Sequence, residues 1–277
     1  MFKKLIKFLK FDKKSEVQTK PLSCILSPYQ EKEATKVDKK EIIFDENALK
    51  VLDKNQLNFK ELLADLSTTH FLAGGTAIAL YLGHRKSIDF DFFSNISQGK
   101  FSDFVIRISK YGLEVSNDDK KNFSGIEFND QDEIHVNITG VKLSLINYYR
   151  VLYDNQKILI KGNNYILGGL RIATIEELVS MKLFAMISRK KWKDAVDLYF
   201  LIKYLNKNLE QLLLLAESKY YINIFNKEAV LEQLISKDWD KTENVEYIIT
   251  DYPPDQEIEN YLEKEALKII GKNKFDT

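Results

Sequence analysis

Residues 71–93 read FLAGGTAIALYLGHRKSIDFDFF, and this stretch decides the fold. Residues 70–75, HFLAGG, predict a short buried strand that ends in glycines. The following TAIALYLG, 76–83, is rich in helix formers, and its final glycine is a typical helix stop. SIDFDFF, 87–93, alternates apolar and acidic residues, which is typical of a strand with two unlike faces. The stretch therefore predicts strand, helix and strand in close succession.

The second predicted strand places two carboxylates together. Because successive side chains point to opposite faces, we expect Ile88, Phe90 and Phe92 to face the core and Asp89 and Asp91 to share the other face. Two such carboxylates lie about 7 Å apart. Oxygen ligands at this spacing suit Mg²⁺ that also binds substrate phosphates. A solvated strand without a ligand is the alternative that this pattern alone leaves open.

Gly74, Gly75 and Thr76 stand where the first strand runs into the helix. Free backbone N–H groups and the helix dipole meet there, so the turn predicts a phosphate cradle to which the threonine hydroxyl adds a donor. It is not a Walker loop, because no Gly-Lys-Ser/Thr follows. His84 and Arg85 lie between the two motifs, where cations would hold a triphosphate, or they belong to an ordinary exposed turn.

The pattern around this stretch predicts an αβ domain over 41–170 with a mixed or antiparallel sheet. Asp45 is placed to cap a helix that extends to Leu66, and the Thr139-Gly140 pair predicts a hairpin. The expected elements are helices at 45–66 and 102–111 and strands at 112–117, 124–128, 133–138 and 141–148.

The remainder, 171–277, predicts a helical domain. Two helices are expected within 174–205, the first with a capping box from Thr174 and Glu177, and further helices at 208–218, 226–237 and 254–270. Asp194 and Asp197 are three residues apart and so share one helix face.

Several cations of the helical part are candidates for contact with a substrate. Lys182 lies on the first of its helices, within reach of a phosphate. The run Arg189, Lys190, Lys191, Trp192 and Lys193 has the residue types that contact RNA phosphates and stack on a base. A solvated loop between two helices is the alternative for this run.

Composition limits the function classes. The 277 residues are 44% hydrophobic, which suffices for a sizeable core. Lys+Arg and Asp+Glu both total 41, so no global field indicates a nucleic-acid partner. The single cysteine excludes an internal disulfide framework and suits a cytoplasmic location. No membrane-spanning stretch or secretory signal is expected.

Residues 1–40 read as a basic, flexible N-terminal arm. Phe2, Leu5, Ile6 and Leu9 fall on one helical stripe among lysines, a pattern typical of contact with an anionic membrane surface or with nucleic acid. A loosely ordered, solvated terminus is the reading that we favour.

Three segments together carry a family resemblance: FLAGGTAIALYLGHRKSIDFDFF at 71–93, GVKLSLINY at 140–148 and IATIEELVSMKLFAMISRKKWKDAVDLYFL at 172–201. In this order they strongly resemble the AbiEii/AbiGii family of nucleotidyltransferase toxins, within the DNA polymerase β-like superfamily. The resemblance covers about residues 45–205. It implies an α+β fold, a polymerase-β-like palm with a mixed sheet followed by an α-helical domain.

The resemblance also implies roles for individual residues. The Gly74-Gly75-Thr76 turn would cradle the triphosphate of an NTP, and Asp89 and Asp91 would hold Mg²⁺. Lys182 matches the nucleotide-binding lysine of the family, and Asp194 matches an aspartate thought to act with the metal site. The implied reaction moves a nucleoside monophosphate from an NTP to a hydroxyl, with tRNA as the expected acceptor. The implied context is a toxin–antitoxin or phage-defence system with a cognate antitoxin.

The chain departs from the wider superfamily at one position. A third carboxylate is usual on a neighbouring strand, yet the hairpin offers His135, Asn137, Lys142 and Ser144. Either Asp194 acts as general base, as the resemblance implies, or catalysis is weak or lost. Glu133 is a remoter candidate for the third carboxylate. The alternative function is therefore a catalytically weak or inactive nucleotide- or RNA-binding module of the same fold.

Overall fold

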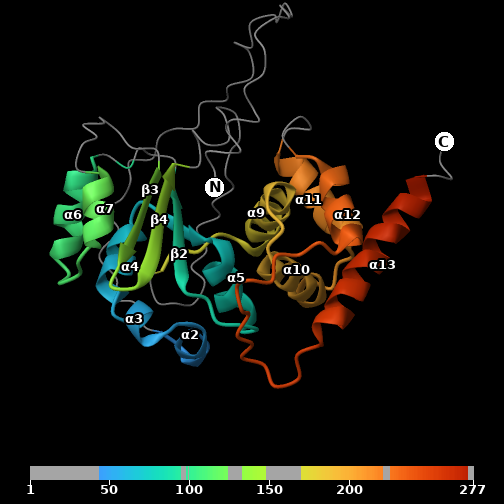
Figure 1. Cartoon of the computed structure of the whole chain (residues 1–277), viewed down its shortest axis with the longest axis horizontal. Helices are drawn as coiled ribbons and strands as arrows, with labels where there is room; N and C mark the ends of the chain where they lie inside the picture. The colour runs from blue at the N-terminus through green and yellow to red at the C-terminus, as the bar shows by residue number, and fades with distance from the viewer. Residues whose placement is uncertain are drawn as a thin grey trace, which may run out of the picture.

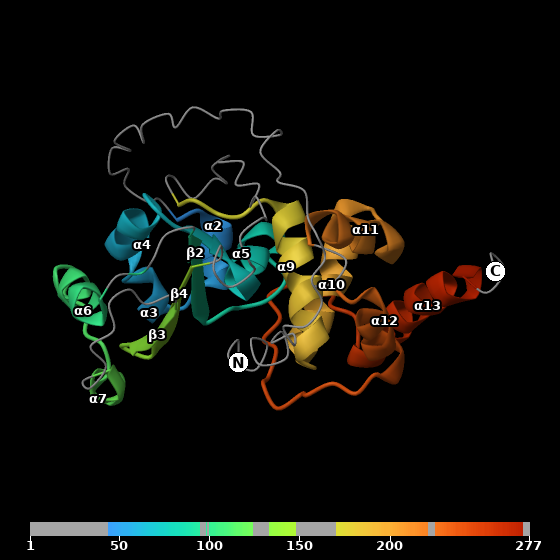
Figure 2. The ribbon, with the colours of Figure 1, turned by 90° about the horizontal axis from the view of Figure 1, so that it is seen from above.

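The computed structural model describes residues 44–94, 98, 100–123, 133–147, 170–220 and 225–273. The predicted arm at 1–40 and the predicted strand at 124–128 lie outside these residues. Figure 1 shows a sheet with short helices on one side of the molecule and a group of longer helices on the other. Seen from above, α9 and α10 lie between the sheet and the remaining C-terminal helices (Figure 2).

The sheet-containing half and the helical half follow one another along the chain. The first comprises α2 (Glu46–Val51), α3 (Lys54–Leu57), α4 (Lys60–Leu66), β1 (Phe71–Ala73), α5 (Gly74–Leu82), β2 (Asp89–Ser94), α6 (Phe101–Ser109), α7 (Asn117–Phe123), β3 (Glu133–Ile138) and β4 (Val141–Asn147). The second comprises α9 (Ile175–Ser188), α10 (Trp192–Leu205), α11 (Leu209–Lys219), α12 (Lys227–Ser236) and α13 (Asp255–Asn273). The predicted α+β fold, with a mixed sheet before the helices, is confirmed.

The four described strands lie in the order β1-β2-β4-β3. β2 pairs antiparallel with β1 and parallel with β4, and β3 pairs antiparallel with β4. Asp91 lies opposite Ala73 of β1, and Asp89 lies opposite Lys142 of β4. Strand β2 therefore has α5, which follows β1 directly, on one side and β4 on the other.

The two faces of β2 differ almost as predicted. Phe90 and Phe92 are fully buried, whereas Asp89 and Asp91 are half-buried. Ile88 is 60% exposed, so its predicted core position is wrong. The reason is that the strand begins at Asp89, and the alternation of the pleat does not reach the residue before it.

Helix boundaries in the first half differ from the prediction. The single helix expected over 45–66 is three short helices, because Asp45 caps the first and Asp53 forms a capping box with Gln56 at the second. The strand expected at 112–117 is a single bridge between Val115 and Ile138, and α7 begins at the end of that segment.

The hairpin prediction is confirmed. Thr139 and Gly140 both have positive φ, at 49° and 88°, as a two-residue turn between β3 and β4 requires. In the helical half, Thr174 accepts from the Glu177 backbone N–H, which is half of the predicted capping box. The other half is not formed, because the Glu177 carboxylate pairs with Lys219 of α11. The helices expected at 208–218, 226–237 and 254–270 correspond to α11, α12 and α13.

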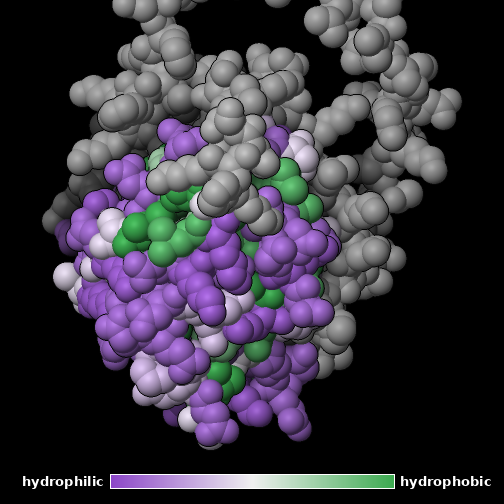
Figure 3. Space-filling model, turned by 90° about the vertical axis from the view of Figure 1, so that its right-hand side faces the viewer, coloured by the Kyte–Doolittle hydropathy of each residue, from purple (hydrophilic) through white to green (hydrophobic). Residues whose placement is uncertain are grey.

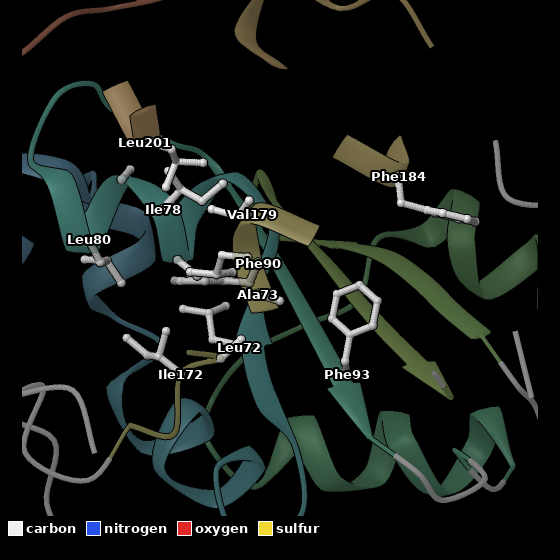
Figure 4. Packing of buried hydrophobic residues seen from close by; sticks show 14 of the residues in the cluster. Leu72, Ala73, Ile78, Leu80, Phe90, Phe93, Ile172, Val179, Phe184 and Leu201 are labelled. Carbon is white, nitrogen blue, oxygen red and sulfur yellow. The ribbon is translucent and has the colours of Figure 1, made fainter. Parts of the chain in front are cut away.

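One hydrophobic cluster extends through both halves. Leu72, Ala73 and Phe90 of the sheet lie close to Val179 of α9 and Leu201 of α10 in Figure 4. Helix α5 packs against both of these helices. The described core is thus continuous across residue 170, and the domain division there stays a prediction.

The face that carries α13 is mostly hydrophilic, with apolar residues in separate patches (Figure 3). Scattered apolar residues of this kind are usual on a water-facing surface. Among the described helices, none combines the length and the apolar character needed to cross a bilayer.

We expect Phe90→Ala to lower the free energy of unfolding by about 3–5 kcal/mol, because it removes a fully buried ring and leaves a cavity. Ile88→Ala, two residues earlier on an exposed side chain, should change it by about 0.5 kcal/mol or less. Urea unfolding followed by circular dichroism measures both. Equal losses would contradict this assignment of the two positions.

Candidate active site

A cleft of about 510 Å³ opens between the sheet and the helical half. Its lining comes from the start of α5, the segment leading into β2, one residue of β4, α9, α10 and the connection before α13. The residues are Gly74, Gly75, Thr76, Arg85, Lys86, Ser87, Ile88, Asp89, Asp91, Lys142, Lys182, Arg189, Lys193, Glu243, Asn244, Val245 and Glu246. Most sequence-predicted site residues are therefore brought together here.

Because Gly74 and Gly75 at the start of α5 have no Cβ, the side chains of Asp91 and Arg85 can lie directly against the backbone there. A Cβ on Gly74 would lie 2.5 Å from Asp91 Oδ2, and one on Gly75 would lie 2.7 Å from Arg85 Nη2. Gly74 also has φ +67°, which disfavours other residues. Because no side chain caps this helix, its first N–H groups remain for an anion.

The Thr76 hydroxyl has a structural role that the sequence did not indicate. It donates to the backbone carbonyl of Asp89 and is hydrogen-bonded to Ser87 Oγ at 2.8 Å. Its side chain is buried. The hydroxyl therefore joins the start of α5 to the start of β2, and the expectation that it donates to a phosphate is not supported by this geometry.

Asp89 and Asp91 are half-buried side by side. Burial is the main cause that raises the pKa of Asp89, and the negative charge of Asp91 is the second. The positive charges of Lys193 and Lys142 partly offset this rise. Asp89 Oδ1 is buried and has no hydrogen-bond partner in the described part of the chain. A buried carboxylate oxygen without a partner is costly, and a bound cation would remove that cost.

The two carboxylates of Asp89 and Asp91 suit Mg²⁺, which needs few protein ligands, better than a metal whose ligands all come from protein side chains. Among the described residues, no group of three or more His, Cys, Asp or Glu side chains is arranged to hold an ion. Mg²⁺ in phosphoryl-transfer sites typically takes one or two carboxylates and completes its shell with water and substrate phosphates. Asp89 and Asp91 offer that number of carboxylates.

Asp197 of α10 fixes the cations at the back of the cleft. It accepts hydrogen bonds from Arg85 at 2.7 and 2.8 Å, lies 2.8 Å from His84 Nε2, and pairs with Lys182 at 2.8 Å. Burial alone would raise the pKa of Asp197, but Arg85 and Lys182 hold it well below its ordinary value. The carboxylate is thus ionised and saturated with donors.

Asp194 occupies a similar environment. It is fully buried, accepts from Lys182 at 2.7 Å, and is bridged by Arg189 at 2.7 and 2.9 Å. Its pKa is lowered because these two cations outweigh the opposing effect of burial. An ionised, fully donor-bound carboxylate is a poor proton acceptor. The geometry therefore argues against the predicted general-base role and gives Asp194 the role of positioning Lys182 and Arg189.

His84 does not face the cleft as expected. Its ring is buried, 4.9 Å from the ring of Phe200, and bonded to Asp197. Burial lowers the pKa of His84, although Asp197 opposes the shift, so the imidazole is neutral at neutral pH. The expectation that His84 holds a triphosphate is not supported, whereas Arg85 and Lys182 do line the cleft.

The aromatic residue of the predicted RNA-contact run is in the core. Trp192 is only 4% exposed and packs edge-on against Trp239 at 6.2 Å, with Lys241 Nζ 4.2 Å from its ring. The prediction that Trp192 stacks on a base is wrong in this structure, because no ring face is free.

The cations of that run differ in their surroundings. Arg189 lines the cleft. Lys190 pairs with Asp238 at 2.6 Å, and Lys191 pairs with Asp240 at 2.7 Å and with Glu243 at 2.9 Å. Contact of Lys190 and Lys191 with RNA stays a prediction, and it would require phosphates to compete with these carboxylates.

Figure 1 shows a connection between α12 and α13, residues 239–252, which we call the strap. Its residues 243–246 line the cleft. Glu246 O accepts from Lys86 N at 2.8 Å, and Ile248 N donates to His84 O at 3.0 Å. Sequence reasoning missed the strap, because it has no periodic pattern and its backbone bonds are long-range. Lys193, the last cation of the predicted RNA-contact run, lines the cleft and pairs with Glu243 of the strap at 2.7 Å.

The mixed sheet, the paired aspartates of β2 and the open start of α5 together provide what a nucleotidyltransferase needs to bind a metal and a triphosphate. Residues 61–264 match the family model described as nucleotidyl transferase AbiEii toxin of a type IV toxin–antitoxin system. The chain belongs to this family, so it is an enzyme whose substrate is an NTP, in a toxin–antitoxin context that implies a cognate antitoxin.

Individual relatives are more distant. An uncharacterized protein of Aquifex aeolicus is 30% identical over 174 residues, which are 62% of this chain and 77% of that one. A candidate nucleotidyltransferase from H. pylori is 19% identical with a TM-score of 0.44, over 81% of this chain and 99% of that one. The nucleotidyltransferase toxin MenT4 from Mycobacterium tuberculosis is 14% identical with a TM-score of 0.37, over 74% and 83% of the two chains.

We expect Asp197→Asn to lower the free energy of unfolding by about 3–5 kcal/mol, because it leaves Arg85 and Lys182 buried with too little opposite charge. Asp238→Asn breaks a pair of similar length between exposed side chains and should cost about 0.5 kcal/mol or less. Urea unfolding of both variants is the measurement. A small loss for Asp197→Asn would contradict the central place of this network.

Proposed function

We propose that the chain is a Mg²⁺-dependent nucleotidyltransferase that moves a nucleoside monophosphate from an NTP to a hydroxyl of RNA, with tRNA as the acceptor. The observation that carries the proposal is the buried, unpartnered oxygen of Asp89 beside Asp91, at the open start of α5. We also propose that the reaction takes place in the cytoplasm, where NTP and tRNA occur together.

The reaction needs two kinds of binding group. The triphosphate is held by the N–H groups at the start of α5 and by Arg85, Lys182 and Arg189, which line the same cleft. Asp89 and Asp91 would hold Mg²⁺, which would supply charge neutralisation at the phosphates. Ion pairs with Asp194 and Asp197 keep these three cations in place. Such catalysis acts by positioning and charge rather than by a protein nucleophile.

The chemical step exchanges a phosphoanhydride bond for a phosphoester bond. The acceptor hydroxyl oxygen forms a bond to the α-phosphorus of the NTP, and the bond from that phosphorus to the oxygen bridging to the β-phosphate breaks. Pyrophosphate leaves, and the hydroxyl proton passes to water. Attacking and leaving oxygens are roughly in line in such reactions.

A second candidate is a nucleotide- or RNA-binding module without turnover. The observation that favours it is that the residues of β4 opposite Asp89 and Asp91 are Lys142 and Ser144, so this neighbouring strand offers no third carboxylate there. Binding of NTP by the wild type, without any product, would select this candidate.

We expect Asp89→Asn to reduce transfer of label from NTP to total bacterial tRNA by about 1,000-fold or more, a change equivalent to about 4 kcal/mol. The reason is that the exchange removes one of two carboxylates that hold the metal. The assay uses each labelled NTP in turn with Mg²⁺ and a denaturing gel. Asp103→Asn, on an exposed position of α6, is the matched control and should retain wild-type rates.

Two outcomes would contradict the proposal. Retained turnover in Asp89→Asn would remove this aspartate from catalysis. Label on protein or on a small hydroxyl compound, but not on RNA, would overturn the acceptor while leaving nucleotidyl transfer intact.

We also expect Asp89→Asn to raise the melting temperature in the absence of Mg²⁺. Burial and the neighbouring Asp91 disfavour the ionised form of Asp89, so a neutral amide there relieves repulsion. Mg²⁺ should raise the melting temperature of the wild type by a few degrees and leave that of the variant unchanged. Equal responses to Mg²⁺ would count against the metal site.

A further inference from the structure

The order of the strands places different elements on the two sides of Asp89 and Asp91. Asp91 of β2 lies opposite Ala73 of β1, and α5 begins at the next residue, Gly74. On its other edge β2 pairs with β4. The open start of α5 and strand β4 therefore lie on opposite sides of Asp89 and Asp91.

The cations near α5 suit the triphosphate. Arg85 Nη2 lies against Gly75, and Arg85 is held there by Asp197. Lys182 and Arg189 are joined through Asp194. The leaving pyrophosphate carries most of the charge of the nucleotide, so we expect it to bind on this side of the cleft, next to these cations.

Lys142 stands on the other side. It is paired in register with Asp89, and paired residues of parallel strands project to the same face, so both line the cleft. Its side chain is exposed, and within the described ranges no carboxylate lies at ion-pair distance from it. The cleft cations Arg85, Lys86, Lys182, Arg189 and Lys193 each have a carboxylate partner.

In-line transfer places the acceptor opposite the leaving group, which is the β4 side. We propose that Lys142 binds a backbone phosphate of the acceptor, so that this site selects a polyanionic RNA strand over an uncharged hydroxyl compound. This inference rests on the proposed function. A carboxylate at that position would repel an incoming phosphate, whereas an unpaired ammonium attracts it.

Lys142→Ala tests the assignment through separate constants for the two substrates. We expect KM for tRNA to rise about 5- to 10-fold, while KM for NTP changes less than about twofold, because the lysine contacts only the acceptor. Lys142→Arg should restore most of the affinity. Lys110→Ala, an exposed lysine at the end of α6, is the matched control and should match the wild type for both substrates.

The salt dependence of tRNA binding provides a second readout that a general loss of structure would not produce. Filter binding of labelled tRNA between low and moderate salt should give a slope of log Kd against log salt that is smaller by about 0.7–1 in Lys142→Ala. An unchanged slope, an unchanged KM for tRNA, or an equal rise in KM for both substrates would overturn the assignment.

The two proposals fail in different ways. If the wild type transfers label to RNA but Lys142→Ala is indistinguishable from it, the inference about Lys142 is overturned and the reaction stands. The opposite outcome is that the wild type transfers nothing to RNA, while Lys142→Ala binds tRNA more weakly and with a smaller dependence of log Kd on log salt. In that case the proposed reaction is overturned, and the inference that Lys142 binds RNA phosphate is kept.

Discussion

The buried pair between Arg85 and Asp197 is the interaction on which the rest of the site depends. It joins the turn between α5 and β2 to helix α10, and both side chains are almost inaccessible to water. Isolating either charge in the core would be strongly unfavourable, so each fixes the place of the other. Through Lys182 the same network reaches α9 and Asp194. The position of the helical half relative to the sheet is therefore set by charge as well as by apolar packing.

The four aspartates of the site form two pairs with contrasting environments. Asp194 and Asp197 are ionised and saturated with donors, whereas Asp89 has an oxygen without a partner and a raised pKa. The first two use their charge to hold cations, and the Asp89–Asp91 pair keeps its charge for a ligand. Such a division is typical of sites that bind a cation together with phosphates, where local stability is given up for function.

The sequence predicted the elements whose signal is local. The glycine pair between strand and helix, the alternation of β2, the hairpin at Thr139 and the cap at Thr174 all depend on neighbouring residues. All four are present, although the glycines begin α5 instead of ending β1. Long-range packing decided the rest. His84 looked like a turn residue, but Asp197, far away in sequence, draws it into the core. The strap could not be predicted, because its backbone pairs with residues of the first half that no local pattern indicates.

The backbone bonds of the strap have a consequence for the order of synthesis. When Asp89 and Asp91 leave the ribosome, Arg85 still lacks Asp197, and the cleft still lacks the wall at Glu243–Glu246. At bacterial elongation rates the last of these residues follows Asp91 by roughly 10 to 30 s. We therefore expect a nascent chain to remain without a complete nucleotide site until most of it has been made. In a toxin built in this way, nucleotidyl transfer starts only after most of the chain has been synthesised.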